Sequence, residues 1–156
     1  MLALRLLDIL NVSLAALVSG IFWGPWLALT RSMRTFPPAV FLEIVHRLDK
    51  NLGGVMGVLY PVALLSFVPV LVLDLVFGCR AAFVLAFLAF ALFVLALVVT
   101  MVVEVPIVKR IRGWSVDAMP PDWQSLRERW VSFHLLRVVP GIVGVALAVG
   151  GALWQR

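Results

Sequence analysis

Charge is what this sequence lacks most. Only 13% of its 156 residues are charged, whereas 63% are hydrophobic and the mean hydropathy is +1.11. Soluble domains carry about 25% charged residues, so this composition predicts an integral membrane protein whose first partner is the lipid bilayer. The net charge of +5 falls in the predicted loops. In a membrane protein such charge reports orientation and headgroup contacts, so we expect no nucleic-acid partner.

Cysteine and the common catalytic motifs are nearly absent too. Cys79 is the single cysteine, so the chain can form no internal disulfide. The sequence contains no Walker loop, no dinucleotide fingerprint and no Gly-x-Ser-x-Gly elbow, which disfavours nucleotide chemistry and serine hydrolysis. A Cys-x-x-Cys-His haem attachment motif is also missing, so any haem would be bound non-covalently.

Long apolar runs, in contrast, are abundant. Four of them suit membrane-spanning helices at about 1.5 Å per residue; they are Ile9–Leu29, Gly54–Leu73, Ala81–Val103 and Val138–Trp154. Each must be helical, because backbone groups find no water to bond in lipid. The sequence therefore predicts an all-α integral membrane protein, a four-transmembrane-helix bundle that forms a single domain over residues 1–156.

Residues 38–52 show a different pattern, with apolar and polar positions on opposite helix faces. The polar face carries Glu43, His46, Arg47 and Lys50. This pattern predicts an amphipathic helix that lies in the membrane interface between the first two spans. Gly53 and Gly54 would then turn the chain into the second span.

The basic residues predict the orientation of the chain. Most of them fall in the two larger loops, residues 30–53 and 105–137. By the positive-inside rule these loops are cytoplasmic and both termini lie outside.

The stretch from Glu104 to Arg137 holds most of the polar chemistry. If a helix begins near Pro120, a 4-3-4-3 spacing places five polar and aromatic side chains on one face. These are Trp123, Arg127, Trp130, His134 and Arg137. Gly141 continues the stripe and would let another helix come close. The stripe indicates a pocket at the membrane interface; the alternative is a belt of Trp and Arg facing lipid headgroups.

A metal site is a further hypothesis. Glu43 and His46 form a Glu-x-x-His pair, the spacing with which helical bundles hold iron or manganese. With Glu104 and His134 they would complete a set of two histidines and one or two carboxylates. The chain has no second Glu-x-x-His, so a solvated polar face explains the pair as well. His46 and His134 as axial haem ligands are another alternative. The cofactor expectation is none or a metal ion, iron or copper, with non-covalent haem as the alternative.

Two motifs carry a resemblance to a known family. Through Glu104-Val105-Pro106 and Trp130-x-x-x-His134-x-x-Arg137, the sequence resembles the small four-helix membrane proteins grouped with the fungal anthrone oxygenases. The stretches FWGPW at 22–26 and FLEIVH at 41–46 look more like the bacterial branch, which implies the bacterial inner membrane. The resemblance covers nearly the whole chain. It implies a monooxygenase-like oxidoreductase that oxidises a small lipophilic aromatic or quinol-like substrate with dioxygen, without an obvious nucleotide cofactor.

The resemblance also implies roles for the stripe. An anthrone carries an acidic CH₂ between aromatic rings, and a base that removes one proton leaves a carbanion able to pass an electron to dioxygen. His134 would be that base, or a metal ligand, and Arg137 would stabilise the enolate or peroxide anion. Glu104 would orient His134 or pair with Arg137. We expect His134 to point into the bundle, within reach of one of these two residues.

The remaining stripe residues would bind the substrate. Trp123 and Trp130 would stack on a flat molecule, with Arg127 between them on the helix. Two further readings stay open: a non-catalytic protein that binds a metal, haem or quinone, and an accessory subunit without chemistry. A homo-oligomer is compatible with any of the three.

Overall fold

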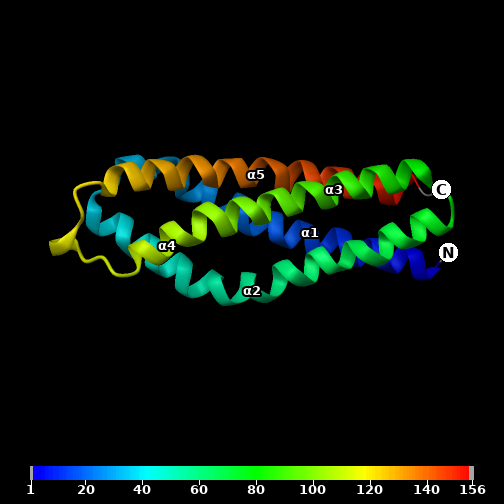
Figure 1. Ribbon diagram of the computed structural model, residues 1–156, viewed down its shortest axis with the longest axis horizontal. Helices are drawn as coiled ribbons and strands as arrows, with labels where there is room; N and C mark the ends of the chain where they lie inside the picture. The colour runs from blue at the N-terminus through cyan, green and yellow to red at the C-terminus, as the bar shows by residue number, and fades with distance from the viewer. Residues whose placement is uncertain (1, 155–156) are drawn as a thin grey trace.

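Four long helices dominate the computed structural model, which describes residues 2–154 (Figure 1). They are α1 (Leu2–Ala28), α2 (Pro38–Val76), α3 (Arg80–Val99) and α5 (Trp123–Trp154). α3 continues through a π-helical segment, η2 (Thr100–Glu104), into the short helix α4 (Val105–Ile111). Two 3₁₀ segments, η1 (Thr30–Thr35) and η3 (Val116–Ala118), lie in the connections. The helices are long and apolar enough for four membrane spans, so the all-α prediction with four spans is confirmed.

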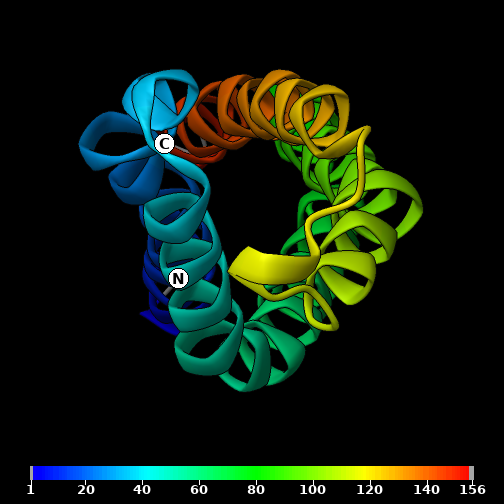
Figure 2. The same ribbon diagram turned by 90° about the vertical axis from the view of Figure 1, so that its left-hand side faces the viewer.

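The helices run along one long axis and surround it. Figure 1 shows the start of α1, the end of α5 and the α2–α3 turn at one end of the bundle, with η1 and η3 at the other. Figure 2, which looks along the bundle from the η3 end, shows the helices arranged as a ring.

The prediction of a separate interfacial helix at 38–52 is wrong, because no separate helix forms there. These residues are helical, but they form the beginning of α2, and Gly53 and Gly54 lie inside that helix. A glycine costs a helix interior only about 1 kcal/mol, whereas a break at membrane depth would leave backbone groups without partners. The apolar face also finds protein to pack on, because Phe41 and Val45 are buried in a cluster with Trp130.

Two other predicted boundaries move. The third apolar run is predicted to end at Val103, but the chain stays helical to Ile111, with Pro106 in the first turn of α4 where a missing N–H is tolerated. The last span is predicted at Val138–Trp154. In the structure α5 is a single helix from Trp123, close to the start predicted near Pro120.

Small residues allow the closest helix packing, which is between α3 and α5. Gly144 faces the ring of Phe93, and Gly151 faces the backbone of Ala82. Membrane helices associate by such close approach, because lipid supplies no hydrophobic drive between them. The tight α3–α5 seam fixes the position of α5, and with it the polar side chains that α5 carries nearer the η3 end.

Candidate functional site

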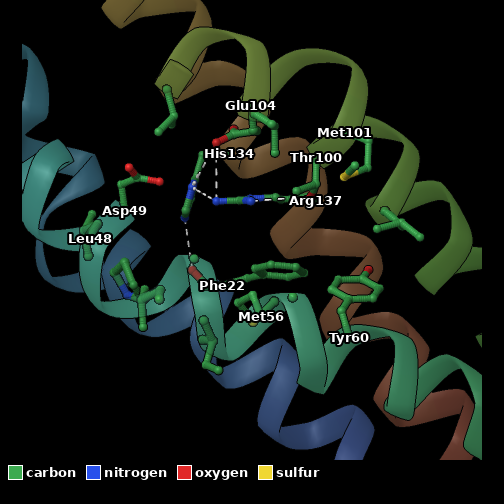
Figure 3. A pocket seen from close by; sticks show the side chains of 18 of the residues that line it. Phe22, Leu48, Asp49, Met56, Tyr60, Thr100, Met101, Glu104, His134 and Arg137 are labelled. Atoms are coloured by element: carbon green, nitrogen blue, oxygen red, sulfur yellow. Dashed lines mark hydrogen bonds and ion pairs between the residues drawn. The ribbon is translucent and has the colours of Figure 1, made fainter. Parts of the chain in front are cut away.

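A cavity of about 590 Å³ lies inside the bundle, bounded by α1, α2, α5 and the continuous α3–η2–α4 segment. Small-molecule sites typically measure about 300–1,000 Å³. One part of the wall is polar and consists of Thr100, Glu104, His134 and Arg137 (Figure 3). The rest is largely apolar and includes Phe22, Met56, Tyr60, Leu97 and Trp130. The cavity therefore suits a largely lipophilic molecule that carries a polar group.

Three charged or titratable side chains meet at the polar wall. Arg137 donates from Nη2 to His134 Nδ1 at 2.8 Å, and the same nitrogen lies 3.3 Å from Glu104 Oε2. His134 Nδ1 lies 4.0 Å from that oxygen, and Arg137 Nη1 reaches Thr100 Oγ1 at 3.5 Å. Glu104 and His134 are buried, with 3% and 1% of their surfaces exposed. The predicted position of His134, inside the bundle and within reach of Arg137 or Glu104, is confirmed.

The contacts of His134 define its tautomer. Its Nε2 lies 3.1 Å from the carbonyl oxygen of Phe22, which can only accept a hydrogen bond. Its Nδ1 faces the guanidinium of Arg137, which can only donate. The neutral imidazole with its proton on Nε2 satisfies both neighbours. His134 therefore ties α1 to α5 and holds Arg137 in place.

Local helix geometry brings this group together. His134 and Arg137 are three residues apart on α5, so they share a face. Glu104 is the last residue of the π-helical η2, and it is buried together with its neighbour Val103. Adjacent residues of a regular α-helix point about 100° apart, so the π turn broadens the buried face just where the carboxylate meets α5. Isolated π turns in α-helices often occur at functional sites.

Of the predicted substrate-binding residues, one lines the cavity. Trp130 belongs to its wall, whereas Trp123 and Arg127 do not. The Arg127 guanidinium lies over the Trp123 ring at 4.9 Å, and Trp123 packs on Phe41 with ring centroids 5.9 Å apart. These residues do share one helix face, but Trp123 lies eleven positions before His134, a distance of about 16 Å along the helix. The first part of the stripe therefore lies beyond the cavity. The binding roles of all three stay predictions.

The predicted metal ligands are not brought together. Glu43 is exposed and pairs with Arg47, and His46 Nε2 lies 3.2 Å from the carbonyl oxygen of Ile111. Within residues 2–154 no three His, Cys, Asp or Glu side chains are grouped closely enough to hold a metal ion. The physical reason is the helix face, because Glu43 lies on the exposed side of α2, opposite the buried side chains of Phe41 and Val45. The geometry also disfavours the haem hypothesis, because Nε2 of His46 and Nε2 of His134 each already face a backbone carbonyl oxygen.

Sequence reasoning missed several residues of the cavity. Tyr60, the only tyrosine, stands inside an apolar run and donates its hydroxyl to the carbonyl of Phe93 at 2.8 Å. A lone tyrosine within a span was a usable signal. Asp49 and Arg112, which line another part of the cavity, form a two-bonded pair at 2.5 and 2.8 Å. The hydrogen bonds to Asp49, together with the negative charge of its carboxylate, raise the pKa of Arg112. Nothing in the sequence links these two distant positions.

Comparison with known proteins gives one match. A family model described as anthrone oxygenase matches residues 50–147, which is more than half of the chain. The matched range contains Thr100, Glu104, His134 and Arg137, all four residues of the polar wall. No curated protein and no solved structure matches the chain.

Proposed function

We propose, because this chain belongs to the anthrone oxygenase family, that it is a membrane-embedded oxygenase acting on a lipophilic aromatic or quinol-like compound with dioxygen. The observation that carries the proposal is the buried group of Glu104, His134 and Arg137 on the wall of a largely apolar cavity. Buried charged groups are costly unless paired, and within apolar spans they commonly mark functional sites.

The chemistry fits a substrate with a CH₂ between aromatic rings and opposite a ring carbonyl, as in anthrone. Removal of one CH₂ proton leaves a carbanion that is delocalised onto the carbonyl oxygen. Dioxygen oxidises this carbanion and forms a carbon–oxygen bond, giving a peroxide. Loss of water from the peroxide leaves a second carbonyl, so one oxygen atom enters the quinone and the other leaves as water.

Arg137 is the anion-binding residue in this proposal. A guanidinium presents several donors in a fixed plane, and preorganised donors are most effective in a site that excludes water. Its position over the Phe22 ring, 4.7 Å from the ring centroid, keeps it beside the aromatic wall. A flat substrate between the aromatic side chains would place its carbonyl oxygen within reach of this cation.

Trp130 gives further support. The residue lines the cavity, and its buried indole N–H finds no hydrogen-bond acceptor within the described part of the chain. Buried indole N–H groups usually have a partner. An oxygen atom on the bound molecule would supply one, which is consistent with a substrate carrying carbonyl or hydroxyl groups.

The test is oxidation of anthrone by the purified protein in nanodiscs. We expect oxygen consumption and anthraquinone formation in equal amounts, at a rate well above that of empty nanodiscs. A protein that binds anthrone but leaves its oxidation rate unchanged would contradict the proposal. An absorption spectrum and metal analysis of the same sample distinguish the enzyme from a non-catalytic binding protein. A Soret band, or stoichiometric iron or copper, without turnover would support non-catalytic binding of haem or a metal.

A further inference from the structure

We propose that Glu104, and not His134, takes the proton from the substrate, and that His134 acts as a positioning residue for Arg137. This inference rests on the proposed function and assigns the reacting atom within it. Three independent observations support it: the free oxygen of Glu104, the occupied nitrogens of His134, and the balance of charge in the buried site.

Glu104 has one carboxylate oxygen available for a ligand. Its Oε2 lies 3.3 Å from Arg137, whereas its Oε1 has no hydrogen-bond partner among residues 2–154. Only 3% of the surface of Glu104 is exposed, and the residue belongs to the wall of the cavity. Buried polar atoms are rarely left without a partner, because the desolvation cost is about 1–3 kcal/mol or more for a charged group. In this proposal the unpartnered Oε1 is the atom that takes the substrate proton.

His134 has no nitrogen available. Its Nε2 is held by the carbonyl of Phe22 at 3.1 Å and its Nδ1 by Arg137 at 2.8 Å. To act as a base through Nδ1, the imidazole would have to carry a proton directly against a guanidinium. Two donors facing each other at this distance repel, so in the arrangement of Figure 3 the lone pair of Nδ1 accepts from Arg137 and orients it.

The charge balance favours the carboxylate as well. Before reaction the site holds one anion, Glu104, beside one cation, Arg137. If Glu104 takes the proton, the negative charge moves to the substrate and Arg137 remains its counter-ion, so the number of charges is unchanged. If His134 took the proton, a new cation and a new anion would form beside the existing pair. Creating charges in a low-dielectric site is expensive.

Every proton and bond of the reaction is accounted for with Glu104 as the one residue that carries a proton. The first C–H bond breaks, its proton goes to Oε1, and the electron pair stays on the substrate. The carbanion reduces dioxygen and forms the C–O bond, and Glu104 returns its proton to the terminal peroxide oxygen. Glu104 then takes the second C–H proton while the C=O bond forms and the O–O bond breaks. The departing hydroxide receives this proton and leaves as water.

Proton exchange without oxygen tests this step by itself. In anaerobic D₂O, nanodiscs containing the wild-type protein should exchange the CH₂ protons of anthrone, read by mass spectrometry, faster than empty nanodiscs. We expect Glu104→Gln to lower the enzyme-catalysed exchange by about 10²–10⁴-fold, the usual contribution of a positioned base. His134→Gln, which keeps one donor and one acceptor but no basic nitrogen, should lower it by less than tenfold. Glu128→Gln, a matched exchange at a half-exposed position of α5 that does not line the cavity, serves as the control.

The outcomes separate the inference from the function. If the wild-type protein neither exchanges nor oxidises anthrone, the proposed function fails. If it oxidises anthrone while Glu104→Gln exchanges at the wild-type rate, or while His134→Gln alone abolishes exchange, the function stands and the assignment of Glu104 is overturned. Should Glu104→Gln fail to fold, Glu104→Asp keeps a carboxylate one methylene further away. It should then show a larger isotope effect than wild type with CD₂-anthrone, and an unchanged isotope effect would overturn the assignment.

Discussion

Arg137 is the residue on which the polar wall converges, because its guanidinium contacts His134, Glu104 and Thr100 from two nitrogens. We expect Arg137→Lys to lower the rate of anthrone oxidation by about 10²–10³-fold, the cost typical of losing an oxyanion donor. A lysine keeps the charge, but it cannot reproduce the planar fork. Steady-state kinetics would show the loss mainly in kcat.

The matched control is Arg129→Lys, on an exposed part of the same helix where the side chain lies over the Phe133 ring. It should oxidise anthrone like the wild type. If Arg137→Lys did the same, the site would not use the guanidinium geometry and the anion-binding role would be refuted.

At the residue scale, spacing within one helix was predictable and contact between helices was not. The 4-3-4-3 stripe correctly placed Trp130, His134 and Arg137 on one buried face of α5. The bond from His134 to the Phe22 carbonyl and the Asp49–Arg112 pair join residues 112 and 63 positions apart. Such contacts depend on how whole helices pack, which side-chain periodicity does not encode.

At the scale of elements, the α3–α5 seam sets a limit on side-chain size. A Cβ at Gly144 would lie 2.8 Å from Cε2 of Phe93, a fully buried ring packed between Tyr60 and Phe67. We expect Gly144→Ala to destabilise the protein by about 1–3 kcal/mol, as overpacking usually does. The measurement is the Tm of the purified protein in detergent.

Gly150→Ala on the same helix is the matched control. A Cβ there makes only an ordinary contact of 3.6 Å with Leu85, and alanine favours a helix interior by roughly 0.5–1 kcal/mol over glycine. The Tm should therefore stay constant or rise. Equal Tm changes in the two variants would show that the seam is looser than described.

A second element-scale prediction concerns the cavity wall on α2. Gly57 lines the cavity, and a Cβ at this position meets no atom within 4 Å. Gly57→Leu should therefore fold normally but reduce the room for a planar substrate, raising the KM for anthrone more than it lowers kcat. Gly20→Leu on α1, where a Cβ also meets nothing and which does not line the cavity, should leave KM unchanged. A KM shift of the same size in both variants would argue against the cavity as the binding site.

The existence of the helices was predictable, whereas their continuity was not. Long apolar runs indicated four spans because backbone groups in lipid must bond internally. The helices α2 and α5 begin many residues before their apolar runs, at Pro38 and at Trp123. In both helices, a segment with a polar face extends beyond the expected membrane core. These segments stay helical because their apolar faces pack with Met33 and Ile107 in a common cluster.

At the scale of the whole molecule, the basic residues predict one orientation. The η1 and η3 end of the bundle carries the basic residues of the two larger loops, opposite the end that holds the start of α1 (Figure 1). We expect this loop-rich end to be cytoplasmic and both termini to lie outside, in a bacterial inner membrane. A reporter enzyme that is active only outside the cytoplasm should be active when fused after Arg156 and inactive when inserted near Ser115. The reverse pattern would overturn the orientation.

The π-helical segment also makes the number of residues, and not only their identity, a condition of the site. Each residue of an α-helix turns the next by about 100°, so removing one residue between Thr100 and Glu104 would force a choice. Either Ile107 and Ile111 would rotate out of the core, or Glu104 would rotate away from Arg137. A deletion of the lipid-exposed Val102 should therefore abolish oxidation, although replacing its side chain should not. In this chain the phase of one helix is set by a single extra residue, and the carboxylate depends on it.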